Sequence, residues 1–273
     1  MIDNFILYLT NMLLTSSNQE DYSSLQLSDE DFIKTIVPTL LLQKNRHLQL
    51  CENYLTDASI SAIVDVMLTC QSLETLALGE NDISDQGLME LGSALPEIPL
   101  GVLVLNSNEI TDKGILDLCK FLPHSHLDTL DLSANHISDA GAEELAKILP
   151  RSNLISIDLS NNRITNKGGR SLALAMRKSN ITTLGLSDNL IASRRVLLEI
   201  ETVEKLVRSD FKIMSTLASA LTISRLGVNS FLRVLPNEVM RRIAPMLYFL
   251  DNLNDLEKES ERDAKQEGNS ETQ

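Results

Sequence analysis

The sequence predicts an α/β solenoid, in which a parallel sheet is backed by a row of helices. Six asparagines recur at a nearly fixed interval, and only the first of the five gaps is one position longer than the rest. Each closes the phrase LxxLxLxxNxI, which is cleanest over residues 73–83, 100–110 and 127–137. Aromatic content is only 4% and Trp is absent, which suits stacked, equivalent layers better than one irregular core. The recurring residues, the asparagine ladder, are Asn53, Asn81, Asn108, Asn135, Asn162 and Asn189.

Each repeat contains a short strand and then a helix. Leu76 and Leu78 alternate on the strand and point into the solenoid. The asparagine follows where the chain leaves the strand, and its amide can satisfy backbone groups of its own and the next layer. Ser84-Asp85 then predicts a helix start, with a hydroxyl cap and an acid suited to the positive helix end. A glycine column that begins at Gly87 predicts close approach of neighbouring backbones.

The period predicts four segments along the chain. The repeats occupy residues 46–190, ending with a sixth strand. Residues 1–45 are expected to form an N-terminal helical cap and a half-repeat without a strand, with residues 15–24 as a polar linker. Residues 191–254 predict a helical C-terminal cap or module. Residues 255–273 are acidic and nearly free of apolar side chains, and are expected to be disordered.

The composition restricts the kind of partner and the compartment. Net charge is −14 and the sequence pI is about 4.7, so a basic protein partner is favoured over nucleic acid. No apolar run is long enough to span a membrane, and no Sec signal peptide is evident. The three cysteines cannot all pair and match no zinc motif, which predicts a cytoplasmic, reducing location without a metal or other cofactor.

The nearly constant period, the LxxLxLxxN strand and the long amphipathic helix resemble the ribonuclease-inhibitor-like class of leucine-rich repeats. The resemblance covers about residues 46–190. It implies a leucine-rich-repeat solenoid, a right-handed horseshoe with a parallel inner sheet and outer helices, closed here by helical N- and C-terminal caps. Members of this class mostly bind proteins, often on the concave face, so we expect a monomeric binding module.

The residues that flank the inward leucines are expected to face the hollow of the horseshoe. Five of them are acids and none is Lys or Arg, while Val102 and Val104 form a small apolar centre. Asp131 and Asp158 are expected to lie side by side on adjacent strands and to hold a partner's Arg or Lys; alternatively, both belong to a common strand phrase and are merely solvated. The predicted partner-binding residues are Glu52, Glu80, Val102, Val104, Asp131, Asp158 and Asp188.

The sequence contains no HExxH, GxSxG, P-loop or GxGxxG motif, and no cysteine follows Cys119, so no enzyme and no catalytic residue is predicted. The glutamate-rich residues 257–261 resemble the export signals of type IV secretion effectors. They predict a bacterial leucine-rich-repeat effector in the host cytoplasm, unless this is an ordinary charged tail.

Two regulatory alternatives remain. Residues 235–238 (Leu-Pro-Asn-Glu) with Ile243 resemble the opening of an F-box, which would make the chain a substrate adaptor of a ubiquitin ligase. Arg163, near the sheet edge, is compatible with a small-GTPase regulator.

Overall fold

The computed structural model describes residues 19–42, 45–194, 196–198, 200–203 and 205. These lie in one compact unit, Met1–Arg208, and residues Ser209–Gln273 form a second unit. The expected N-terminal cap helix, most of the expected C-terminal module and the acidic tail lie outside the described residues. The four predicted segment boundaries therefore stay predictions.

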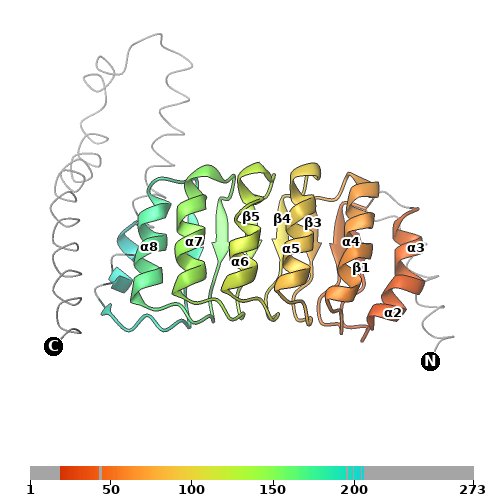
Figure 1. Ribbon diagram of the computed structural model, residues 1–273, viewed down its shortest axis with the longest axis horizontal. Helices are drawn as coiled ribbons and strands as arrows, with labels where there is room; N and C mark the ends of the chain where they lie inside the picture. Colours follow the sequence, from red (N-terminus) through yellow and green to blue (C-terminus); the bar gives the residue numbers. More distant parts are fainter. Residues whose placement is uncertain (1–18, 43–44, 195, 199, 204, 206–273) are drawn as a thin grey trace, which may run out of the picture. The chain divides into compact units, whose positions relative to one another are not determined.

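Seven parallel strands form one open sheet in chain order (Figure 1). Successive strands pair in the same register, so that Leu48, Leu76, Leu103, Leu130 and Ile157 are opposite one another. All five are fully buried. The strands are β1 (Gln19–Asp21), β2 (His47–Gln49), β3 (Thr75–Ala77), β4 (Val102–Val104), β5 (Thr129–Asp131), β6 (Ser156–Asp158) and β7 (Thr183–Gly185).

A row of helices covers one face of the sheet (Figure 1). Each main helix begins after a Ser or Thr whose hydroxyl accepts a hydrogen bond from a backbone N–H in the first turn, as predicted. Leu88 and Leu91, from one such helix, are fully buried in the core that the helices form with the sheet. The predicted leucine-rich-repeat solenoid is therefore confirmed. The main helices are α4 (Asp57–Cys70), α5 (Asp85–Ala94), α6 (Asp112–Leu118), α7 (Asp139–Ile148) and α8 (Asn166–Met176).

Short turns and a first helical stretch complete the unit. Three of the helices are followed by a 3₁₀ turn that opens with Leu-Pro: η2 (Leu95–Glu97), η3 (Leu122–His124) and η4 (Leu149–Arg151). Before β2, the chain is helical through α2 (Asp29–Asp31), a wide π turn, η1 (Phe32–Ile36), and α3 (Val37–Leu40).

The prediction of a linker and a strandless half-repeat before residue 46 is wrong. Residues Gln19–Asp21 form β1 and pair in parallel with β2. Two substitutions in the pattern hide this repeat: Glu20 stands opposite Leu48, and Leu25 occupies the place one repeat before Asn53. Burial raises the pKa of Glu20, although a hydrogen bond from the Tyr22 hydroxyl, 3.1 Å long, partly opposes this effect.

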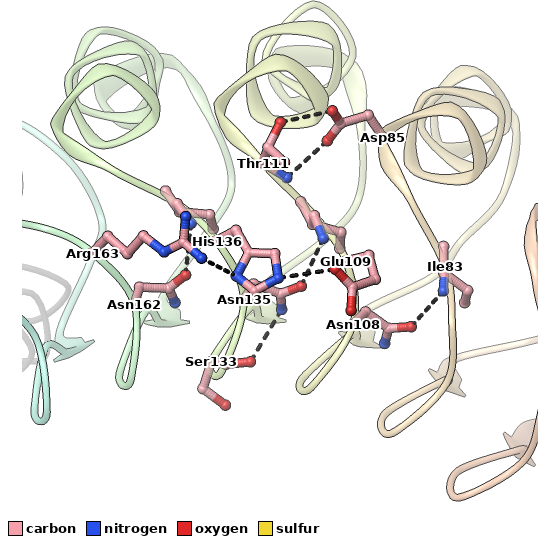
Figure 2. A network of polar contacts seen from close by, with 12 residues as sticks. Ile83, Asp85, Asn108, Glu109, Thr111, Ser133, Asn135, His136, Asn162 and Arg163 are labelled. Atoms are coloured by element: carbon pink, nitrogen blue, oxygen red, sulfur yellow. Dashed lines mark hydrogen bonds and ion pairs between the residues drawn. The ribbon is translucent and has the colours of Figure 1, made fainter.

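The asparagine ladder joins each repeat to the preceding one, not to the next as predicted. In Asn108, Nδ2 donates to Leu105 O and Asn106 O of its own repeat, each at 3.2 Å, and to Leu78 O of the preceding repeat at 2.9 Å. Its Oδ1 accepts from the backbone N–H of Ile83, also in the preceding repeat, at 2.9 Å (Figure 2). The same pattern recurs from Asn53 to Asn189. A single side chain therefore ends one strand and completes the turn of the repeat before it.

A second ladder of aspartates runs along the helix starts. The carboxylate of Asp85 accepts hydrogen bonds from the backbone N–H and the hydroxyl of Thr111 in the next repeat, at 2.8 and 2.7 Å (Figure 2). Equivalent pairs join Asp29 to Thr56 and Asp139 to Thr165. We predicted these acids only as partners of the helix dipole, so their link between repeats is new. The asparagine side chains thus bond to the preceding repeat, whereas the aspartate side chains bond to the next one.

The glycine column makes room for the aspartate ladder. A Cβ placed on Gly141 would lie 2.6 Å from Asp112 Oδ1, and the backbone N–H of Gly141 donates to that same oxygen at 2.9 Å. Gly168 stands in the same relation to Asp139. The predicted close approach of backbones is found at Gly114 and Gly141, where a Cβ would lie 3.2 Å from Asp85 Cα and 3.4 Å from Asp112 Cα, but the nearest neighbour is in each case the preceding repeat's carboxylate.

Replacing Asn108 with Ala should destabilise the protein by about 3 kcal/mol, because several buried backbone groups lose a partner at once. The matched control is Asn189→Ala. Asn189 makes the same bonds at the end of the ladder but is only half-buried, so we expect a loss of about 1 kcal/mol. Urea unfolding followed by circular dichroism measures both. Equal losses would contradict the dependence on burial.

The stability that Asp29 contributes should be lost in acid. Burial by itself raises the pKa of Asp29, but hydrogen bonds from Ser59 and Thr56 outweigh it, and the net direction is downward. A depressed carboxyl pKa stabilises the folded state above the unfolded value, near pH 4, and this contribution disappears as pH falls through the folded pKa.

Urea unfolding of the wild type and Asp29→Asn at several pH values tests this expectation. The difference in unfolding free energy should be largest near pH 7 and shrink below about pH 4. Glu30→Gln, which alters only an exposed ion pair with Lys34, should show little effect at either pH. A wild-type-to-Asp29→Asn difference that is constant from pH 7 to pH 3 would refute the assignment.

Candidate functional site

The candidate surface is the open sheet face, the side of the sheet opposite the helices. We define it by the first and third residues of β2–β7 and the two residue positions that precede each ladder asparagine. The strand residues on this face are mostly half-buried, whereas the leucines between them are fully buried. Among these positions, all of which the structure describes, there is no Lys or Arg. The face residues of each strand thus border solvent, as the alternation predicts.

Asp131 and Asp158 are paired in the register of β5 and β6, as predicted. Each carboxylate, however, already accepts hydrogen bonds through Oδ1. Asp131 binds the backbone N–H and the hydroxyl of Ser133 at 2.9 and 2.7 Å, and Asp158 binds the backbone N–H of Ser160 at 2.8 Å. These are Asx-type turns at the strand ends. The two aspartates therefore shape the turns, and only Oδ2 of each is left without a role in them.

Glu52, Glu80 and Asp188 are exposed and occupy one column immediately before the ladder asparagines. Each has a φ angle of 55°, in the left-handed region. All seven repeats place a residue in this conformation at the equivalent position, and none of the seven is glycine. Because this conformation is unfavourable for residues with a Cβ, each side chain is retained here at a cost in stability.

Val102 and Val104 are half-buried on β4, near the middle of the sheet. A Cβ on Gly79 would lie 2.1 Å from Asn106 Oδ1, so the glycine leaves room for the Asn106 amide to lie over β3. Ala77, also at a face position, is only 4% exposed. The centre of the face therefore offers a small apolar area bordered by an amide.

A second polar feature lies on the loops that follow the strands. The residues directly after three ladder asparagines are Glu109, His136 and Arg163. His136 Nε2 lies 2.9 Å from Glu109 Oε2, and Arg163 Nη2 lies 3.1 Å from His136 Nδ1 (Figure 2). A guanidinium only donates, so Nδ1 accepts from Arg163, and a neutral imidazole then donates from Nε2 to Glu109. Sequence reasoning identified Arg163 alone and missed this chain of contacts.

The described part of the chain shows neither an activated cysteine nor a metal site. Burial raises the pKa of all three cysteine thiols, that of Cys119 to about 12, so none of them is a thiolate nucleophile at neutral pH. No group of three or more His, Cys, Asp or Glu residues among the described ones could hold a metal ion. Within the same residues, no helix is long and apolar enough to cross a membrane. The expectation that the chain is not an enzyme stays a prediction.

Comparisons with known proteins bear on the repeats. A leucine-rich-repeat family model matches residues 69–92, 100–119, 124–146 and 152–173. No curated protein matches the sequence.

Many solved structures are similar to this chain, and two of them illustrate the likeness. Actin-binding site 2 of leiomodin-1 is 14% identical with a TM-score of 0.48; the match covers 59% of this chain and 95% of that one. An internalin from Listeria monocytogenes is 24% identical with a TM-score of 0.42; the match covers 61% of this chain and 48% of that one. At these values neither structure indicates a function for this chain. The family match and the repeating strand–helix architecture together show that the described unit is built of leucine-rich repeats.

Proposed function

We propose that the chain binds a basic segment of a protein partner on the open sheet face. One observation carries the proposal: the face positions from β2 to β7 include five acids and no Lys or Arg. Leucine-rich repeats generally mediate protein–protein interactions, which agrees with a binding role. An acidic face attracts a basic segment at long range and disfavours an acidic one.

The acids have unequal parts in this proposal. Glu52 and Glu80 are exposed at the β2–β3 end, and they steer the approach of the partner. Each exposed ion pair contributes only up to about 1 kcal/mol, so charge alone gives weak binding. Asp131 and Asp158 contribute through Oδ2, since Oδ1 of each is engaged in its own turn.

Affinity requires an apolar contact in addition to charge. Val102 and Val104 provide the apolar area on the face, and a Leu or aromatic side chain from the partner would cover them. The face itself lacks Trp, Tyr and Phe, the residues that usually dominate protein interfaces together with Arg. The partner must therefore supply the large anchoring side chain.

The finer predictions rest on other parts of the chain. The effector signal at residues 257–261 and the F-box-like segment at residues 235–243 lie outside the described residues. The GTPase-regulator alternative rests on Arg163, which is exposed and contacts His136. These roles, and the cytoplasmic or host-cell location, stay predictions.

Charge reversal on the face should weaken binding to a basic probe. The probe is an extended peptide with lysines on either side of two central leucines, and fluorescence anisotropy measures its affinity. Glu52→Lys with Glu80→Lys should weaken binding about tenfold in low salt, because two favourable contacts become repulsive.

Asp65→Lys with Glu90→Lys is the matched control. It changes net charge equally, but on helices α4 and α5, and should leave the affinity within about twofold. If both double variants weaken binding equally, only net charge matters and the face is not the site.

Glu80→Gly should separate stability from binding. Glycine relieves the left-handed strain at this position, so unfolding free energy should rise by about 1 kcal/mol, while affinity for the lysine–leucine peptide falls. Ala134→Gly, at the equivalent position, should stabilise similarly without changing affinity. Thermal unfolding and the anisotropy titration measure the two effects. Unchanged binding in Glu80→Gly would exclude Glu80 from the site.

A further inference from the structure

Negative charge is concentrated at one end of the chain. Residues 1–110 hold 16 of the 38 acidic residues but only 3 of the 24 basic ones. Residues 111–205 hold 12 of each. Because the strands follow one another in chain order, the repeats from β1 to β4 are strongly acidic in total and those from β5 to β7 are close to neutral in total, although Asp131, Asp158 and Asp188 of the open sheet face belong to the second group.

Two rows of side chains at the ends of the strands carry the same gradient. We call the row that precedes the strands the entry rim and the row that follows them the exit rim. The entry rim ends each 3₁₀ turn and consists of Glu97, His124 and Arg151, continued by Lys178. The exit rim follows the ladder asparagines and consists of Asp82, Glu109, His136 and Arg163.

The two rims place like residues at both ends of a strand. β4 lies between two glutamates, β5 between two histidines and β6 between two arginines. His136 is half-buried and the other five of these side chains are exposed. The two rims belong to different loops, so the order Glu, His, Arg occurs independently in each of them. Together they place negative charge at both ends of β4 and positive charge at both ends of β6.

The exit rim is ordered by its own contacts. The hydrogen bonds from Arg163 to His136 and from His136 to Glu109 hold the three side chains in a row along successive repeats (Figure 2). Exposed side chains held in this way present their charges at defined places. The arginine therefore lies at one end of the row, and the carboxylate lies at the other.

We propose that the partner segment is bipolar and is bound in one orientation only. This inference rests on the proposed function and extends it. Basic residues of the segment lie at the β2–β3 end, an apolar residue covers Val102 and Val104, and acidic residues meet Arg151 and Arg163 at the rims of β6. The acids reach the rims and not the middle of the strands, where Asp131 and Asp158 lie.

Charge complementarity is the argument for this occupant. A segment in the proposed orientation pairs its basic residues with Glu52 and Glu80 of the face and its acidic residues with Arg151 and Arg163 of the rims. A segment turned end for end places like charges together at both ends, and such contacts are repulsive. A uniformly basic segment gains at β2–β3 and at Asp131 and Asp158, but it also meets Arg151 and Arg163 at the two ends of β6. The charged residues of the face and rims therefore favour a partner segment with basic residues at one end and acidic residues at the other, and not merely a basic segment.

Three peptides of equal length test the inference with the full chain in low salt. One carries lysines around central leucines, as above. The second has a lysine block, two leucines and a glutamate block. The third has the composition of the second with lysines and glutamates alternating. Fluorescence anisotropy should show that the block peptide binds about tenfold more tightly than the alternating one.

Arg151→Glu with Arg163→Glu should abolish the preference for the block peptide and should not weaken the lysine–leucine peptide. Lys147→Glu with Lys167→Glu is the control, because it makes the same charge change on α7 and α8 and should preserve the preference. Thermal unfolding verifies that each variant is folded.

Equal affinity of wild type for the block and alternating peptides would overturn the bipolar inference, and so would a preference that survives the arginine reversal. If the lysine–leucine peptide binds wild type while the block preference is absent, only this inference fails. If none of the three peptides binds wild type, the proposed function fails with it.

Discussion

The structure depends on an asparagine amide that, in six of the seven repeats, completes the turn of the repeat before it. Each ladder asparagine donates to three carbonyl groups and accepts one backbone N–H, so a single side chain serves four backbone groups in two successive repeats. The residue that precedes each ladder asparagine adopts a left-handed conformation. That conformation directs Glu52 and Glu80 to solvent and aligns the residues that follow into the exit rim. Surface chemistry is thus arranged by a buried interaction.

Much of the fold could be predicted because the repeat period reports both strand register and helix position. The inward leucines, the helix caps and the pairing of Asp131 with Asp158 follow from counting along the chain by one repeat at a time. β1 could not be recognised, because its repeat has Glu20 and Leu25 where the pattern expects a leucine and an asparagine. The aspartate ladder was hidden for another reason: an acid at a helix start already has a sufficient local explanation in the helix dipole.

The candidate site was predicted in position but not in detail. Alternation along a strand indicates which residues face solvent, but it says nothing about hydrogen bonds within the turn. For that reason the engagement of Asp131 by Ser133, and the position of the Asn106 amide over Gly79, appear only in the structure. The residues of the two rims recur in the sequence at the spacing of the repeat. The structure adds that the two loops stand before and after the same strands.

The direction of the asparagine ladder also affects how the chain can fold as it is made. The asparagine that accepts the backbone N–H of Leu55 is 26 residues further along, and the one that serves Ile83 is 25 residues further. During synthesis, therefore, the hydrogen bond from each turn to its asparagine can form only after nearly one more complete repeat has emerged from the ribosome. A nascent array therefore always ends in one repeat whose turn still lacks its asparagine. In the finished protein Asn189, the last ladder residue, completes the turn of the repeat before it and is itself only half-buried.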